Sequence, residues 1–164
     1  MASDTFPMTP WGQQQLRDEV RKIKEVDRAD NVREIESALE HGDLRENAEY
    51  HAAKERQGKL DARLRYLEYR LGNALVIDPT AVRVVDKVAF GATVTVLDMD
   101  TDAEHTYAIV GEDEADADRG RISITAPLAR AMLGKEEGDE AVIRLPKGER
   151  SLEVVTVVYK AIEE

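Results

Sequence analysis

The sequence predicts an α+β protein, with an antiparallel coiled-coil hairpin in residues 1–79 and a small antiparallel β-sheet domain with one short helix in residues 80–164. In the first part, apolar residues recur at alternating spacings of three and four, which is typical of a coiled-coil helix. Gly42 interrupts this pattern near its midpoint and divides it into two helices. From Val82 the apolar period changes to two, the period of a strand with one buried face. The two parts meet near 77–82.

The first helix is expected to begin at Thr9-Pro10, with Thr9 as N-cap and Pro10 in the first helical position. The residues up to about Phe6 are expected to form a loose terminus. Because charge surrounds a single apolar seam, the hairpin is expected to be a solvent-exposed rod roughly 45 Å long. The predicted seam residues are Leu16, Val20, Ile23, Val32, Ile35 and Leu39 in the first helix, and Leu60, Leu64, Leu67 and Leu71 in the second.

The second part contains short alternating segments separated by glycine and proline turn signals. One helix-like segment, 127–133, ends at Gly134. The predicted strands cover 88–96, 106–110, 121–124, 141–145 and 152–158.

Charge and composition exclude several classes of function. The net charge is −11, with 13 Lys+Arg against 16 Asp+Glu up to Pro79 (−3) and 10 against 18 from Thr80 (−8). The second part should therefore repel nucleic acid, since phosphate binding requires clustered Lys and Arg. The absence of cysteine excludes disulfides and thiolate zinc sites. With no apolar run long enough for a membrane span and no signal-peptide pattern, we expect a cytoplasmic protein.

Asp43 and Glu46 form the most suggestive pair, because residues three apart in a helical turn share a face. Two carboxylates at an exposed turn could bind Mg²⁺ if a partner supplied the remaining ligands. Alternatively, Asp43 is the N-cap of the second helix and Glu46 completes a capping box. Spacing alone favours the cap.

Further polar residues surround this pair. Glu49 and Tyr50 follow it, His41 and His51 flank it, and three basic residues could steer RNA phosphates or simply form ion pairs on a solvated face: Arg45, Lys54 and Arg56. Residues 113–116 resemble a helicase tetrapeptide, but no glycine-rich phosphate loop precedes them, and solvation of an acidic loop explains them. The sequence lacks the residues for self-contained catalysis.

Residues 41–55, HGDLRENAEYHAAKE, resemble the signature of the bacterial transcript cleavage factors GreA and GreB, and are more similar to GreA. The second part agrees independently through segments 90–94, 107–111, 126–131 and 134–139. Together the resemblance covers about Pro7 to Tyr159.

The resemblance implies a coiled-coil arm and an FKBP-like domain that docks at the secondary channel of bacterial RNA polymerase. Asp43 and Glu46 would then help hold a second, weakly bound Mg²⁺ near the nascent RNA 3′ end, while the polymerase holds the first, in two-metal hydrolysis of backtracked RNA. The factor would not itself be an enzyme, would bind no metal stably alone and would act as a monomer away from membranes. Supporting residues implied at the hairpin end are Asn47, Glu49 and Tyr50; those implied in polymerase docking are Thr125, Ala126 and Pro127.

Three other interpretations compete with a cleavage factor. A Gre-fold inhibitor would block the channel without promoting cleavage, but it need not keep Asp43 and Glu46. A coiled-coil adaptor would use the acidic pair only as a helix cap. A prolyl isomerase is disfavoured, because the second part has few aromatic residues to line a proline pocket.

Overall fold

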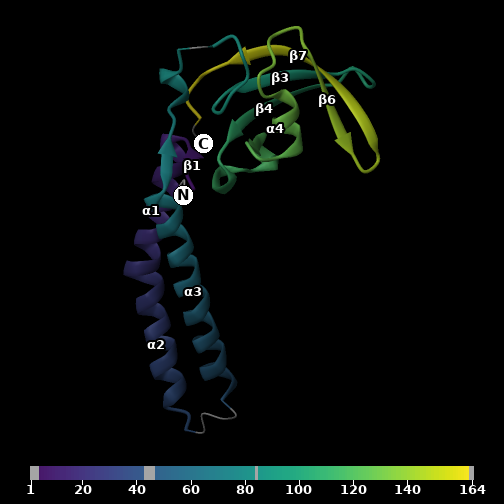
Figure 1. Cartoon of the computed structure of the whole chain (residues 1–164). Coiled ribbons are helices and arrows are strands. Elements are labelled where there is room, and N and C mark those ends of the chain that lie inside the picture. Colours follow the sequence, from purple (N-terminus) through teal and green to yellow (C-terminus); the bar gives the residue numbers. More distant parts are fainter. Residues whose placement is uncertain (1–3, 43–46, 84, 163–164) are drawn as a thin grey trace. The chain divides into compact units, whose positions relative to one another are not determined.

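The computed structural model describes residues 4–42, 47–83 and 85–162 (Figure 1). The chain forms two compact units. One unit comprises Gln14–Asn73, and the other combines the N-terminal segment up to Gln13 with the chain from Ala74 onward. The N-terminal segment thus groups with the sheet, which differs from the expected division at residue 79.

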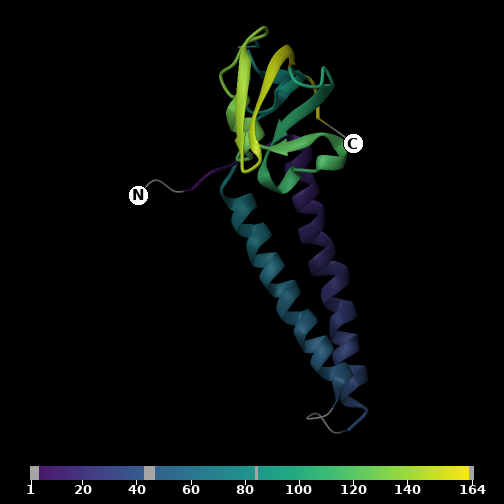
Figure 2. The same cartoon turned by 90° about the vertical axis from the view of Figure 1, so that its right-hand side faces the viewer.

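The hairpin contains three helices and one π-helical segment. Along the chain these are α1 (Pro10–Lys22), η1 (Ile23–Asp27), α2 (Arg28–Leu39) and α3 (Ala48–Gly72). Both views show α2 and α3 running side by side in opposite directions (Figures 1 and 2). Helix α1 begins at Pro10, and the Thr9 hydroxyl accepts a hydrogen bond from the Gly12 amide at 3.1 Å. The predicted N-cap and first helical residue are confirmed.

The predicted seam is correct near the start of the hairpin and holds in α2 at Ile35, which is partly buried, but is wrong for Val32 and Leu39. Leu16 and Ile23 are buried, but Val32 and Leu39 are 49% and 45% exposed. Their immediate predecessors, Asn31 and Ala38, are buried instead. The physical reason is η1, because a π-helical turn contains an extra residue and rotates the following helix relative to a regular heptad pattern.

On α3 the predicted seam holds better. Leu64 and Leu67 are buried, and Leu60 and Leu71 are partly buried. Ala53 is a further buried position near the start of this helix.

The sheet unit is built on five strands in the order β5-β4-β3-β7-β6. Their bounds are β3 Thr93–Asp98, β4 Glu104–Val110, β5 Arg121–Ser123, β6 Glu140–Leu145 and β7 Gly148–Val158. Three neighbouring pairs are antiparallel, but β4 and β5 are parallel. The expectation of a purely antiparallel sheet was wrong for β5. Two 3₁₀ turns, η3 (Glu112–Glu114) and η4 (Ala117–Arg119), carry the chain from β4 to β5, so this pair is not a hairpin.

Helix α4 (Pro127–Met132), the predicted short helix, completes the core of this unit. Met132 is fully buried in the cluster that contains Val94, Val96, Ile109 and Val154. The arrangement of a helical hairpin followed by a sheet domain with one short helix is confirmed. Within the described segments, no helix has the length and apolar character needed to cross a membrane.

The described N-terminal residues take regular structure from Phe6 onward, whereas Asp4 and Thr5 have none. Strand β1 (Phe6–Met8) pairs in parallel with β2 (Ala74–Val76). The next residue, Thr9, donates its amide to Glu114 at 3.0 Å and also donates its hydroxyl to the same carboxylate. Glu114 is buried and accepts a further bond from the Gly111 amide at 2.9 Å. Solvation of an acidic loop therefore does not explain Glu114, which instead anchors the start of α1.

Candidate functional site at the hairpin end

The site predicted from the sequence lies at the connection between α2 and α3. Helix α2 ends at Leu39, and Gly42 has a φ of +93°, the left-handed conformation that glycine adopts without strain. Asp43, Arg45 and Glu46 lie outside the described residues. Their predicted roles as Mg²⁺ ligands and as an RNA-steering cation stay predictions.

Asn47, not Asp43, is the N-cap of α3. Its side-chain oxygen accepts a hydrogen bond from the Tyr50 amide at 3.0 Å, and its backbone is extended, as a cap requires. The N-cap of α3 is thus Asn47 rather than the predicted Asp43, which lies outside the described residues, and the helix begins four residues later than a cap at Asp43 would require. Sequence reasoning overlooked this cap although asparagine is among the best N-cap residues, because the Asp43–Glu46 spacing offered an equally good signal earlier in the chain.

The Asn47 side chain also reaches the other helix. Its amide nitrogen donates a hydrogen bond of 2.6 Å to the backbone oxygen of Ala38. That oxygen belongs to the last turn of α2 and also accepts a hydrogen bond from the His41 amide at 3.1 Å. One side chain thus satisfies a donor at the start of α3, adds a second hydrogen bond to an acceptor at the end of α2, and joins the two ends of the connection.

The structure brings several other predicted residues together around this end. His41 approaches Glu49 with Nε2 and Oε2 3.4 Å apart, and both side chains are exposed, so this contact is weak. Tyr50 is half-buried, and its ring meets that of His51 edge-on at a centroid distance of 5.7 Å. The predicted supporting residues Asn47, Glu49 and Tyr50 therefore share the first turn of α3 or its cap.

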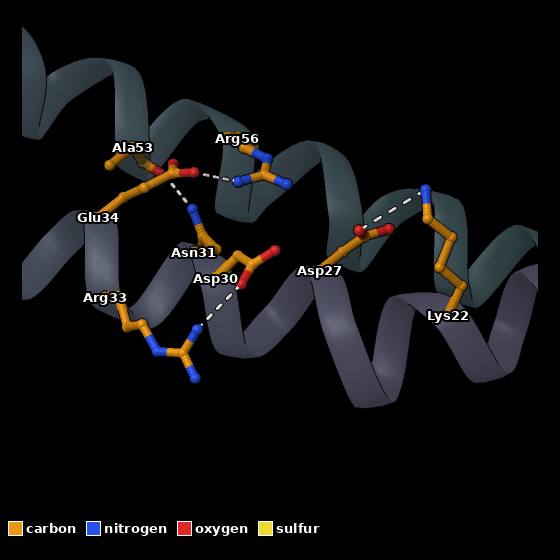
Figure 3. A network of polar contacts seen from close by, with 8 residues as sticks. All are labelled: Lys22, Asp27, Asp30, Asn31, Arg33, Glu34, Ala53 and Arg56. Atoms are coloured by element: carbon orange, nitrogen blue, oxygen red, sulfur yellow. Dashed lines mark hydrogen bonds and ion pairs between the residues drawn. The ribbon is translucent and has the colours of Figure 1, made fainter.

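The predicted RNA-steering residues that the structure describes both have side-chain partners. Lys54 donates to the side-chain oxygen of Gln57 at 2.8 Å. Arg56 forms an ion pair with Glu34 of α2, across the hairpin (Figure 3). Ion pairing on a solvated face, the alternative considered from the sequence, describes Arg56, while RNA steering stays a prediction.

The residues predicted to dock on the polymerase form the turn before α4. Thr125 shares a hydroxyl–hydroxyl hydrogen bond of 2.7 Å with Ser123. Ala126 is the residue before α4, and Pro127 is its first residue. Thr125 and Pro127 are exposed, so this turn presents them to solvent. Their role in docking is not tested by this geometry.

Among residues 4–42, 47–83 and 85–162, no group of three or more His, Asp or Glu side chains could hold a metal ion. Asp43 and Glu46 lie outside that search. Their carboxylate oxygens are the donors that Mg²⁺ prefers, and a pair of them leaves most coordination positions to water or to a partner. The donor chemistry thus fits a shared Mg²⁺ rather than a metal enclosed by this chain.

A helical hairpin that gathers polar side chains at its end, together with a separate mixed-sheet unit, defines a two-part protein with a coiled-coil arm and a sheet domain. Comparison with known families identifies the family. The family described as "Transcription elongation factor, N-terminal" matches residues 6–76, and "Transcription elongation factor, GreA/GreB, C-term" matches residues 83–159. The chain belongs to the GreA/GreB family of transcription elongation factors.

Individual relatives agree with this assignment and with the resemblance seen in the sequence. Transcription elongation factor GreA of Francisella tularensis subsp. novicida is 53% identical over 160 residues, covering 98% of this chain and 100% of that protein. GreA of Francisella tularensis subsp. holarctica (strain LVS) has the same identity and coverage.

Solved structures of the family are more distant. GreA factor homolog 1 (Gfh1) of Thermus thermophilus is 24% identical, with 94% of this chain and 99% of that chain covered and a TM-score of 0.43. GreA/GreB from Nitrosomonas europaea is 20% identical, with 94% and 100% covered and a TM-score of 0.41. The family assignment rests on the sequence matches.

Proposed function

We propose that this chain binds bacterial RNA polymerase at its secondary channel and stimulates the polymerase's own Mg²⁺-dependent cleavage of backtracked RNA. The hairpin brings Asp43 and Glu46 to the polymerase active centre, near the nascent RNA 3′ end. The chain acts as a cytoplasmic monomer and is not an enzyme by itself. Membership of a family of transcription elongation factors supports the class of partner.

The observation that carries this proposal is the identity of the α3 N-cap. Because Asn47 caps the helix, the acidic pair is not required for that purpose. Two carboxylates at a hairpin turn, without a capping task at α3, favour a role in binding a cation supplied or shared by a partner.

In this mechanism the chain provides oxygen ligands and position. Mg²⁺, when bound, activates water and stabilises the charge that develops on the cleaved phosphate. The Asp43 and Glu46 carboxylates would hold that ion together with groups of the polymerase. Asn47 would hold both ends of the connection that contains them, through its bonds to Tyr50 and Ala38. The exposed turn Thr125–Pro127 would contact the polymerase from the sheet unit.

The test uses a polymerase stalled in a backtracked state with labelled RNA, Mg²⁺ and the full-length chain. Wild type should release short 3′ fragments rapidly. Asp43→Asn and Glu46→Gln should abolish this release while binding to polymerase is retained. Glu36→Gln, which removes one negative charge from an exposed position of α2, is the matched control and should cleave normally.

Binding without cleavage by wild type would contradict the proposal and identify a channel-blocking inhibitor. Full cleavage by the Asp43→Asn variant would contradict the metal-binding role of the pair.

A further inference from the structure

The hairpin seam contains one step that departs from a heptad repeat. The buried positions along its first half are Leu16, Ile23, Asn31 and Ala38, which are separated by seven, eight and seven residues. The step of eight spans the π-helical segment η1, where the Arg28 amide bonds to the Ile23 oxygen five residues earlier. The extra residue in this turn rotates α2 so that Asn31 and Ala38 face α3.

Asn31 makes a specific bond from inside this seam. It is 2% exposed, and its side-chain nitrogen donates to the backbone oxygen of Ala53 on α3 at 2.9 Å (Figure 3). A buried polar side chain in a coiled coil reduces stability but can specify register. Here the bond reaches the α3 backbone beside the small side chain of Ala53, whereas a slip of one turn would place Asn31 against the longer side chain of Glu49 or Gln57.

The residues next in sequence form a competing apolar face. Val32 and Leu39 are seven residues apart, like Asn31 and Ala38, and lie one residue further along the helix. One residue corresponds to a rotation of about 100°. Apolar burial alone would favour turning Val32 and Leu39 inward, because it is non-directional and proportional to the area removed from water. The observed face contains an amide and a methyl group instead.

Apart from the Asn47–Ala38 bond at the hairpin end, the other contacts across the hairpin are poorly suited to select the register. The ion pairs Glu19–Arg63, Arg28–Asp61 and Glu34–Arg56 are formed by side chains with substantial exposure. Such pairs contribute little, and their long side chains can adapt to a shifted partner. The Asn31 bond is short-armed and buried, so it discriminates between alignments more sharply.

We propose that Asn31, together with η1, sets the rotational and axial register of the hairpin and is therefore a positioning residue for transcript cleavage. The inference rests on the proposed function in one respect, namely that the hairpin end carries the acidic pair. A slip of one helical turn displaces one helix by about 5.4 Å along the other. Displacements much smaller than this are enough to disable a catalytic arrangement.

The first experiment maps the register by disulfide cross-linking in the full-length chain, which contains no cysteine of its own. Glu34→Cys with Arg56→Cys joins side chains that contact each other in the native alignment. Glu34→Cys with Leu60→Cys, which lies one turn beyond Arg56 on α3, reports a shifted alignment. Each pair is made with Asn31 present and with Asn31→Leu.

We expect only the native pair to cross-link efficiently when Asn31 is present, and the shifted pair to gain cross-linking in the Asn31→Leu background. Asn31→Ala, which removes the donor without adding apolar surface, should show the same gain. Asn73→Leu is the matched control, because among the described residues the Asn73 side chain bonds only to the Tyr69 oxygen, in the helix that Asn73 follows. It should leave the cross-linking pattern unchanged.

The second experiment compares stability with cleavage in the cysteine-free variants. Asn31→Leu should melt at the same temperature as wild type or higher, yet cleave backtracked RNA at least about tenfold more slowly while still binding polymerase. If Asn31 had a purely structural role, the cleavage rate of a variant would fall only when its melting temperature also falls.

Either of two results overturns the proposal: the native cross-link alone in the Asn31→Leu background, or shifted cross-links with full cleavage. If wild type itself does not stimulate cleavage, the proposed function fails, and the cross-linking pattern still decides whether Asn31 sets the register.

Discussion

Replacing Asn47 with alanine should loosen the hairpin end by an amount that follows from two hydrogen bonds. The side chain accepts from the Tyr50 amide at 3.0 Å and donates to the Ala38 oxygen at 2.6 Å. Loss of an N-cap costs about 1 kcal/mol. Loss of the second hydrogen bond costs about 1 kcal/mol more. Asn47→Ala should therefore lower the free energy of opening the first turn of α3 by about 2 kcal/mol.

Native-state hydrogen exchange measures this quantity directly. A change of about 2 kcal/mol corresponds to hydrogen exchange roughly thirtyfold faster at the His51 amide. This amide bonds to the backbone oxygen of Asn47 in the native helix. The Val94 amide, in the sheet unit, serves as an internal reference.

Asn47→Ser separates the two bonds, because serine keeps the cap and loses the reach to Ala38. It should produce about half of the alanine effect in free energy. Unchanged exchange in the Asn47→Ala variant, or equal effects of serine and alanine, would refute the reasoning that this side chain joins both helices.

Three further substitutions test other parts of the fold. Gly12→Ala should destabilise the chain although alanine favours helix, because the added Cβ would lie 2.2 Å from the Glu114 side chain. The overpacking costs about 1–3 kcal/mol, which outweighs a gain in helix propensity of about 1 kcal/mol. The melting temperature should therefore fall. Leu67→Ala removes a fully buried seam residue and should cost about 3 kcal/mol in denaturant unfolding. The hydrogen bond from Arg150, with backbone bonds, lowers the pKa of Asp98 below its ordinary value of 3.8. The ionised Asp98 carboxylate therefore contributes fully to the free energy of unfolding above pH 3.8, and this contribution is lost as pH falls through the lower pKa of the folded state. Asp98→Asn should thus lower the free energy of unfolding at about pH 7, and the difference from wild type should shrink toward about pH 2. A difference that does not change with pH would contradict this.

Much of the fold followed from local patterns. The Thr9-Pro10 start, the break at Gly42 and the change to a period of two each depend on a few neighbouring residues, and each agrees with the structure. Strand β5 was predicted, but its parallel pairing with β4 was not, because that pairing depends on the path through η3 and η4 rather than on the alternation of β5 itself.

The connection between the two hairpin helices was predictable in its location and less so in its detail. The motif at 41–55 led to the family, which the comparisons then confirmed. Two good N-cap signals, at Asp43 and Asn47, lie four residues apart, and local propensity does not choose between them. Asn47 also bonds to the Ala38 oxygen on the other helix, and a rule based on neighbouring residues does not take such a contact into account.

The sequence by itself determined the class of structure, the place where the hairpin turns and the family to which the chain belongs. Only the tertiary structure decided which face of α2 lies inside. Val32 and Leu39 have the apolar character and spacing of a seam, yet Asn31 and Ala38 occupy it. Periodicity is a property of one helix, whereas burial depends on how a π-helical turn rotates that helix against its partner and on the Ala53 oxygen that meets Asn31 there.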